Sequence, residues 1–218
     1  MLVSLPAEIT GDEYGTARYL SIASAPQESE LSIIIRERDT AFKRYLATAP
    51  LGAPLVIESA KGALVLDSTQ TNVCIAGGIG IVPFLSIIAS IVRLPSETYV
   101  FAINRTPETA VGLAGLSERA LQDDHLHLIP VFTRSASLNA ASGIESGHLN
   151  PAMLRHVSAI PSARFLVTGA HEFVSDTVTM LVTLGIPQAT IVTEEFCGYG
   201  SYRCPHCAAR YAAVPKKT

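Results

Sequence analysis

Residues 72–93 read NVCIAGGIGIVPFLSIIASIVR, and this stretch predicts a strand, a glycine turn and a helix in direct succession. The apolar run before the glycines is typical of a short strand that is buried in a parallel sheet. Gly77, Gly78 and Gly80 follow it, and Pro83 suits the first turn of a helix. Without a Cβ in the way, backbone N–H groups at such a turn can approach a phosphate, and the helix N-terminus adds partial positive charge. We therefore expect a pyrophosphate-binding turn.

Two other interpretations of this stretch stay open. The glycines read G-G-I-G and do not match the dinucleotide fingerprint G-x-G-x-x-G, so the segment could be a core strand–turn–helix without a ligand. The stretch from Val73 to Val92 also carries no charge and has the length of a membrane helix. The paired glycines, the early proline and the polar sequence on both sides argue against that interpretation, so we expect no membrane span.

Composition narrows the class of protein. The 218 residues suffice for one large domain or two small ones, and 48% of them are hydrophobic against 16% charged. A net charge of −3 does not favour a nucleic-acid partner. The first residues show no secretion signal, and three of the four cysteines are bunched near the end, unlike a disulfide framework. We expect a cytoplasmic protein.

The order of the predicted elements indicates two kinds of structure. Short β-type runs separated by turn clusters fill the N-terminal part, and a helix that Asp39 or Thr40 can cap interrupts them. Strands then alternate with helices, which is typical of a parallel, doubly wound sheet. The predicted strands are 2–6, 19–24, 31–36, 54–59, 63–66, 73–76, 98–104, 126–133, 164–169 and 190–196, and the predicted helices are 41–48, 84–93, 108–121, 150–157 and 171–185.

Six segments, in this order, resemble motifs of the ferredoxin–NADP reductase superfamily. They are RYLSIAS at 18–24 (flavin-binding R-x-Y-S), DTAFK at 39–43 (flavin-pyrophosphate turn), GALVL at 62–66 (G-x-F-x-L), AGGIGIVP at 76–83 (nicotinamide-nucleotide loop), TGA at 168–170 (C-G-P) and EEFCGY at 194–199 (E-E-F-x-G-Y). Together these segments run through nearly the whole chain, and the ordered set is much more specific than any single motif.

The resemblance implies an N-terminal antiparallel flavin-binding β-barrel at 1–68 and a parallel doubly wound NAD(P)-binding sheet at 69–199, followed by a cysteine-containing tail at 200–218. Family members carry further strand sequence ahead of the segment that begins this chain, so by this comparison the barrel would be truncated at its start: either the start of the chain is assigned too late, or something else completes the barrel. A barrel with an open edge is a poor stand-alone structure, and a partner subunit could complete it.

The resemblance also implies a flavin-dependent oxidoreductase. It would pass electrons between NAD(P)H and a one-electron acceptor such as ferredoxin or a partner oxygenase, with FAD as its cofactor. Two alternatives stay open: an electron-transfer subunit of the dihydroorotate dehydrogenase type with a C-terminal [2Fe–2S] cluster, and a flavin-free nucleotide-binding or scaffold subunit.

On the flavin side, the resemblance assigns Arg18 to the flavin pyrophosphate and Ser21 to the neighbourhood of flavin N5. The stacking aromatic of the family is Leu20 in this chain, with Tyr19 one position earlier, so FMN stays open beside FAD. The expected flavin-binding residues are Arg18, Tyr19, Leu20, Ser21, Thr40, Ala41 and Phe42, and Ile35 and Arg36 are expected to bind a cofactor as well.

On the nucleotide side, the glycine turn should hold the NAD(P) pyrophosphate. Glu194 or Glu195 could bind the nicotinamide amide, and Ser21, Thr168 and Phe196 are the residues expected nearest the reacting rings. Arg105 could meet a 2′-phosphate or be a solvated side chain, so NAD against NADP stays open. The expected nucleotide-side residues are Gly77, Gly78, Ile79, Gly80, Pro83, Asn104, Arg105, Thr168, Gly169, Glu195 and Phe196.

Cys197, Cys204 and Cys207 form a possible metal site near the C-terminus. Their sequence resembles the [2Fe–2S] ending of dihydroorotate dehydrogenase subunits, but six residues separate the first two cysteines where that family has four, and no fourth cysteine follows. A zinc site that includes His206 and a set of free thiols are the alternatives.

Overall fold

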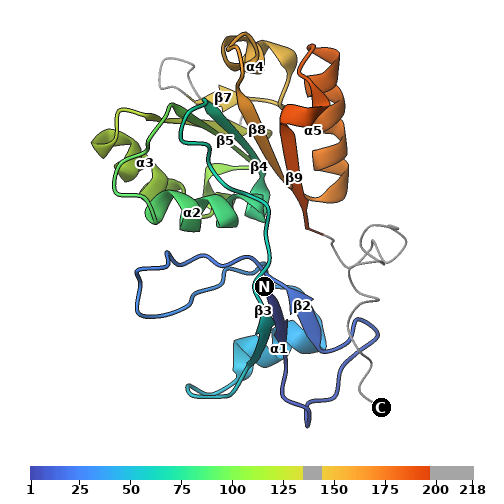
Figure 1. Ribbon diagram of the computed structural model, residues 1–218. Coiled ribbons are helices and arrows are strands. Elements are labelled where there is room, and N and C mark those ends of the chain that lie inside the picture. Colours follow the sequence, from blue (N-terminus) through green and yellow to red (C-terminus); the bar gives the residue numbers. More distant parts are fainter. Residues whose placement is uncertain (135–143, 197–218) are drawn as a thin grey trace.

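The computed structural model describes residues 1–134 and 144–196, which form two sheets (Figure 1). The N-terminal sheet is antiparallel, with the order β2-β1-β3, and consists of β1 (Leu2–Ser4), β2 (Ala17–Tyr19) and β3 (Val56–Ser59). The second sheet is parallel, with the order β7-β6-β5-β4-β8-β9. Its strands are β4 (Asn72–Gly77), β5 (Thr98–Asn104), β6 (Leu126–Phe132), β7 (Glu145–Ser146), β8 (Arg164–Gly169) and β9 (Ile191–Glu195). The predicted fold class is confirmed.

Helices cover both faces of the parallel sheet. They are α2 (Val82–Ala89), α3 (Leu113–Gln122), α4 (Pro151–Ser158) and α5 (His171–Thr183), while α1 (Ala41–Thr48) packs on the N-terminal sheet. Short 3₁₀ turns lie at Gly78–Ile81, Pro107–Thr109 and Gln188–Thr190. Buried side chains of α2 and α3 join one apolar cluster and those of α4 and α5 join the other, so the sheet is doubly wound as predicted.

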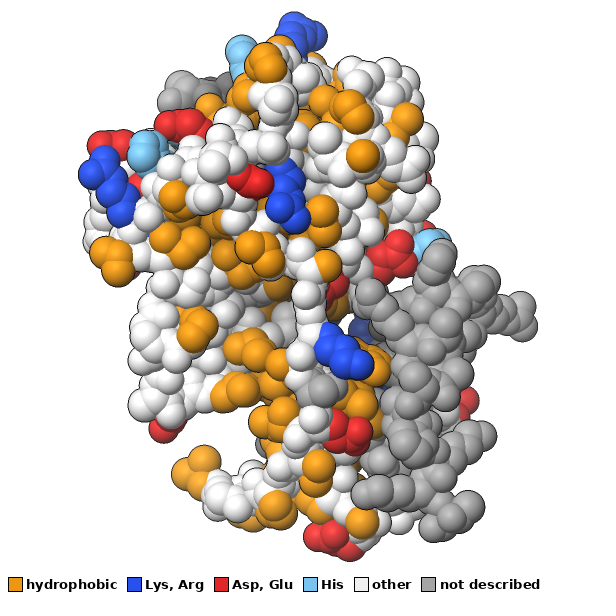
Figure 2. Space-filling model, in the orientation of Figure 1, with side chains coloured by type: hydrophobic (Ala, Val, Ile, Leu, Met, Phe, Trp, Pro, Cys, Tyr) orange, Lys and Arg blue, Asp and Glu red, His pale blue; other side chains and the backbone are white. Residues whose placement is uncertain are grey.

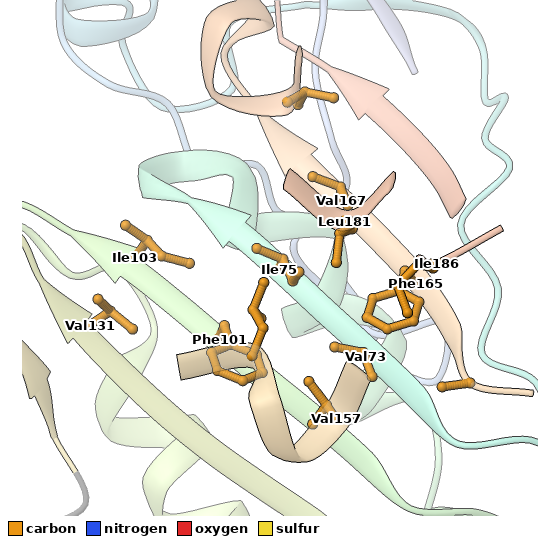
Figure 3. Close-up of a cluster of buried hydrophobic side chains, with 13 residues drawn as sticks. Val73, Ile75, Phe101, Ile103, Val131, Val157, Phe165, Val167, Leu181 and Ile186 are labelled. Atoms are coloured by element: carbon orange, nitrogen blue, oxygen red, sulfur yellow. The ribbon is translucent and has the colours of Figure 1, made fainter. Parts of the chain in front are cut away.

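Strand β4 lies at the centre of the parallel sheet and is buried on both faces. Val73 and Ile75 pack into the cluster under α4 and α5, which Figure 3 shows in close-up, while Cys74 and Ala76 pack into the cluster under α2 and α3. Alternate residues of one strand thus supply both cores. The strand ends at Gly77, where the predicted glycine turn begins as a 3₁₀ turn and leads into α2.

The N-terminal sheet has fewer strands than predicted. The predicted strand at 31–36 contributes an isolated bridge between Ile22 and Ile33, and 63–66 forms no strand. The reason for the second error is packing: Leu64 is buried in the cluster under α2 and α3, and Leu66 packs against the same cluster. This segment therefore packs with the parallel sheet and does not pair with β1 or β3.

Strand β3 leaves apolar side chains in solvent. Val56 and Ile57 are 48% and 51% exposed although they point to opposite faces, and Leu55 beside them is 39% exposed. Figure 2 shows hydrophobic side chains gathered over the lower part of the molecule, where the N-terminal sheet lies. The parallel sheet, in contrast, buries its apolar residues on both faces.

Two hydrogen bonds join the N-terminal part to helix α2. The hydroxyl of Ser86 donates to the Ser24 carbonyl at 2.6 Å, and Nε2 of Gln27 donates to the Ala89 carbonyl at 2.6 Å. The loop that contains Ser24 and Gln27 follows β2, so these bonds set the position of β2 relative to the glycine turn at the other end of α2.

Asp123 is a buried carboxylate that joins the end of α3 to the segments that lead into β5 and β6. It accepts hydrogen bonds from the Leu94 amide at 2.8 Å and the His125 amide at 3.2 Å, and it pairs with Arg119 at 2.7 Å. Burial alone would raise the pKa of Asp123, but the two amides and the Arg119 guanidinium outweigh burial and lower it.

We expect Asp123→Asn to lower the free energy of unfolding at neutral pH by about 2 kcal/mol, because the charged partner of Arg119 is lost. A carboxyl with a lowered pKa stabilises the fold above its unfolded-state pKa, and this contribution disappears as the pH falls through the lowered value. The difference between wild type and variant should therefore shrink below about pH 4. Urea unfolding at several pH values measures it, with exposed Asp124→Asn as the control. A difference that does not change with pH would contradict this role.

Candidate functional site

A cleft of about 1010 Å³ lies between the two sheets. Its N-terminal side is formed by the end of β2 and the segment before α1, and its other side by the glycine turn, the ends of β5 and β6, and the start of α5. Twelve of the predicted site residues line this cleft: Arg18, Tyr19, Leu20, Ser21, Ile35, Arg36, Gly77, Gly78, Ile79, Asn104, Arg105 and Phe196. The residues predicted for flavin and for nucleotide thus meet in one place.

The other predicted residues do not line the cleft. They are Thr40, Ala41, Phe42, Gly80, Pro83, Thr168, Gly169 and Glu195. Phe42, Pro83 and Thr168 are buried, and Phe42 lies in the small core of the N-terminal part.

Arg18 is 5% exposed and organises the loop before β2. Its Nη1 donates to the carbonyls of Tyr14 at 2.7 Å and Ala17 at 2.6 Å, and its guanidinium lies 5.3 Å from the centroid of the Phe42 ring. Arg18 lines the cleft as well. The side chain therefore combines a structural role with a positive charge at the cleft.

The N-terminus of α1 is the predicted flavin-pyrophosphate turn, and here it is hydrogen-bonded to a carboxylate from elsewhere in the chain, that of Asp12. Asp12 accepts a hydrogen bond from the Ala41 amide at 2.6 Å and another from the Tyr14 amide at 2.9 Å. Burial would raise the pKa of Asp12, but these two amides and nearby Arg18 lower it overall. Thr40 caps the helix as predicted, accepting from the Lys43 amide at 3.4 Å. A phosphate at this turn would have to replace Asp12.

Two further cations line the cleft beside Arg36, and sequence reasoning missed them. Arg38 and Lys43 come from the same segment, 36–43, which reads RERDTAFK and has three cations in eight residues. Three cations against the two acids Glu37 and Asp39 leave this segment with a formal charge of +1, and the recurrence of cations next to the predicted turn is the signal that could have identified them. Phosphate groups are favourable partners for such a cluster.

Ser21 provides a direct indication of a ligand. Its Oγ is buried, and among residues 1–134 and 144–196 it has no hydrogen-bond partner. A buried hydroxyl without a partner is unfavourable, and Ser21 lines the cleft. A polar ring edge, such as that of a flavin, would satisfy it. With the cations of the same side, the residues present fit a flavin with a phosphate tail.

The glycines of the turn serve different purposes. Gly78 lines the cleft with φ +57°, and a Cβ there would lie 3.3 Å from Nη2 of Arg36. A Cβ on Gly77 would lie 2.7 Å from the Phe173 ring of α5, and a Cβ on Gly80 would lie 2.7 Å from the Thr168 carbonyl oxygen. The guanidinium of Arg36 lies directly against Gly78 where both line the cleft, whereas Gly77 and Gly80 let the turn pack on α5 and β8.

Thr168 supports the turn from behind. It is fully buried at the end of β8, and its hydroxyl donates to the Gly80 carbonyl at 2.7 Å. The resemblance places Thr168 beside the nicotinamide, but the structure directs its hydroxyl to Gly80. It therefore holds the turn in place through a hydrogen bond between two residues that are 88 positions apart in the sequence.

We expect Thr168→Val to lower the free energy of unfolding by about 1.5 kcal/mol, because the Gly80 carbonyl loses its buried donor while the side-chain volume is kept. Guanidinium unfolding measures the change. Thr168→Ser retains the hydroxyl and is the matched control, with a smaller loss. Equal stability of wild type and Thr168→Val would show that this hydrogen bond contributes nothing net.

The ends of β5 and β6 form the far end of the cleft. The predicted residues Asn104 and Arg105 lie there, and Thr109, Thr133 and His148 join them. The carboxyl ends of neighbouring parallel strands are where open α/β sheets bind ligands, and this rule could have indicated Thr133. The lining residues that sequence reasoning missed are Ile34, Arg38, Lys43, Val82, Ile103, Thr109, Val111, Thr133, His148, Ala170, Glu172, Phe173 and Asp176.

Glu195 and Phe196 are adjacent in the sequence, but their side chains lie on different sides of the chain. Phe196 lines the cleft, and its amide donates to the Gly169 carbonyl at 2.8 Å. Glu195 does not line the cleft, and its Oε2 lies 2.9 Å from Nδ1 of His171. The nicotinamide contact predicted for Glu195 stays a prediction, and it would compete with His171.

The predicted metal ligands Cys197, Cys204 and Cys207 lie outside the described residues. Within 1–134 and 144–196, His, Cys, Asp and Glu side chains form no group of three that could hold a metal ion. In the same part of the chain, no helix has the length and apolar character to cross a membrane.

Comparison of the sequence with known proteins finds distant relatives, and no protein-family model matches it. A flavohemoprotein of Oceanobacillus iheyensis is 24% identical over 204 residues, which are 89% of this chain and 50% of that protein. NADH-cytochrome b5 reductase 1 of Ajellomyces capsulatus is 26% identical over 209 residues, which are 88% of this chain and 66% of that protein. The chain thus spans about half the length of the flavohemoproteins that it matches.

Solved structures show the same fold. The FAD/NAD-binding domain of nitric oxide dioxygenase from Vibrio cholerae superposes with a TM-score of 0.71 at 16% identity, covering 90% of this chain and 84% of that one. A ferredoxin NADP+ reductase from Neisseria gonorrhoeae with bound FAD and NADP superposes with a TM-score of 0.67 at 21% identity, covering 89% and 84%.

Proposed function

Since the chain belongs to the ferredoxin–NADP reductase-like family of FAD- and NAD(P)-binding reductases, we propose that it passes electrons between NAD(P)H and a one-electron acceptor through a bound flavin. The observation that carries the proposal is the shared cleft. The segment after β2 and the glycine turn after β4 form its two sides, so two cofactors held by these segments would meet there.

The division into a flavin-binding part at 1–68 and a nucleotide-binding part at 69–199 belongs to this proposal. A bound flavin accepts a hydride from nicotinamide and can release electrons one at a time, which ordinary side chains cannot do. The chain's own residues bind and orient. Arg18, Arg38 and Lys43 supply positive charge for the flavin phosphate, and the Ser21 hydroxyl would bond the ring edge.

On the nucleotide side, Gly78 and Arg36 would bind the NAD(P) pyrophosphate, since the Arg36 guanidinium lies beside the glycine turn and both residues line the cleft. Arg105 and His148 lie at the far end of the cleft, where the adenosine ribose would bind. A 2′-phosphate on that ribose would contact the Arg105 guanidinium and could accept a hydrogen bond from the His148 ring. Phe196 would border the space where the two rings stack. Stacking brings the reacting atoms to within about 3.5 Å, which is the geometry that hydride transfer requires.

The acceptor is proposed to be a redox protein that takes single electrons. The similar proteins include flavohemoproteins and a ferredoxin reductase of a carbazole 1,9a-dioxygenase system, which supports haem proteins and ferredoxins as the classes to test. Because the flavohemoproteins are about twice as long as the region they share with this chain, half of each such relative has no counterpart in the match.

The test is a titration of the purified chain with FAD and with FMN, followed by anaerobic addition of NADH or NADPH. We expect one flavin to bind, with two absorption bands in the blue region, and both bands to bleach when the nucleotide is added. A one-electron acceptor should then restore them. A broad additional shoulder would indicate an iron–sulfur cluster, which is the alternative of an electron-transfer subunit. Failure to bind either flavin would contradict the proposal and favour a scaffold subunit.

A further inference from the structure

The carboxyl ends of β8 and β9 are linked by a side-chain pair. Nδ1 of His171, the first residue of α5, lies 2.9 Å from Oε2 of Glu195, the last residue of β9. A backbone bond from the Phe196 amide to the Gly169 carbonyl lies beside it. Two independent links therefore fix the chain at the point where Phe196 enters the cleft.

The pair determines which way the next side chain points. Successive side chains of an extended chain point to opposite sides. Glu195 is drawn to His171 and does not line the cleft, so Phe196 is directed into it. The Glu195 side chain is only 23% exposed, so water screens the contact incompletely. If Glu195 lost its partner, the end of β9 would retain only its backbone bonds to β8.

We propose that His171 is a positioning residue that acts through Glu195 to set the place of Phe196 in the cleft. The inference rests on the proposed function for its consequence, because Phe196 borders the space where the rings would stack. Orientation is decisive there: a displacement of about 1 Å can cost a hydride-transfer site about 100-fold in rate. His171 itself does not line the cleft.

The first arm of the test needs no cofactor. The chain contains no tryptophan, so Phe196→Trp introduces a single fluorescent reporter at the position in question. We expect His171→Ala in this background to raise acrylamide quenching about twofold, since a half-buried ring that becomes exposed offers about twice the surface. His171→Asn should restore low quenching, because its amide can donate to Glu195 from nearly the place of Nδ1. His156→Ala, at an exposed position on α4, is the matched control.

The second arm uses the flavin-loaded chain with the native Phe196. His171→Ala and Glu195→Ala should each lower the limiting rate of flavin reduction about 10-fold, with less than a twofold change in the Kd of the nucleotide. The double variant should be no slower than either single one, because both changes remove the same contact. His171→Asn should recover most of the rate.

The outcomes separate this inference from the proposed function. Unchanged quenching of the reporter when His171→Ala is added to Phe196→Trp, or additive losses of rate in the double variant, would overturn the positioning role. A quenching response in a chain that binds no flavin would support the positioning role and overturn the proposed function instead.

Discussion

Gly80→Ala is expected to lower the free energy of unfolding by about 3 kcal/mol, near the upper end of the usual cost of overpacking. The new Cβ would lie 2.7 Å from the carbonyl oxygen of Thr168 and 2.9 Å from its carbonyl carbon. Both are backbone atoms of β8, a strand bonded on both sides by β4 and β9, so they cannot move aside cheaply. Guanidinium unfolding of the purified variants measures the loss.

Gly115→Ala is the matched control for this substitution. Gly115 lies inside α3, and a Cβ there would have nothing within 4 Å. The same chemical change should therefore stabilise the protein by about 0.5–1 kcal/mol, because alanine favours the helix over glycine. If Gly80→Ala were as stable as wild type, the packing of the turn against β8 would be looser than the structure shows.

Arg36→Ala is expected to weaken binding of NAD(P)H about 30-fold, which corresponds to about 2 kcal/mol for a charge-assisted hydrogen bond to phosphate. Nη2 of Arg36 lies 3.3 Å from the position that a Cβ on Gly78 would occupy, so the guanidinium stands at the mouth of the glycine turn. Arg36 is exposed, and the free energy of unfolding should change little. Equilibrium titration of the nucleotide measures the Kd.

Arg93→Ala removes the same charge at an exposed position outside the cleft and should leave the Kd within about twofold, since solvent and salt screen a distant charge. Equal loss of affinity in both variants would mean that only the overall charge matters. No loss in either would remove Arg36 from the nucleotide site.

The central strands of the parallel sheet could be predicted closely from the sequence because they are buried on both faces, whereas the short, exposed edge strand β7 was not predicted. Strands β5 and β8 match the predicted ranges 98–104 and 164–169 to the residue, since apolar runs end there at a polar residue or a glycine. The N-terminal part was harder. Its strands have three or four residues, too few for a clear period, and segment 63–66 is held by contacts with the other sheet.

For the cleft, too, local sequence patterns could be read, whereas contacts between distant residues could not. The segments around Ser21 and Gly78 follow local motifs, and the structure brings both to the cleft. Contacts between residues distant in sequence could not be predicted. A side chain at position 77 would clash with the Phe173 ring, and the Thr168 hydroxyl bonds to Gly80, which lies 88 positions earlier in the sequence. No local pattern encodes such pairs, so the contact between Thr168 and Gly80 became visible only in the structure.

The carboxylate of Asp12 on the Ala41 amide changes what cofactor loading means for this chain. A phosphate that reached this turn would displace an anion already bonded there, so loading would be an exchange of one negative group for another. The net gain of such an exchange is the small difference between two similar affinities. Under the proposed function, this turn would therefore add little to the affinity for a cofactor, and the chain without one would keep its turn intact.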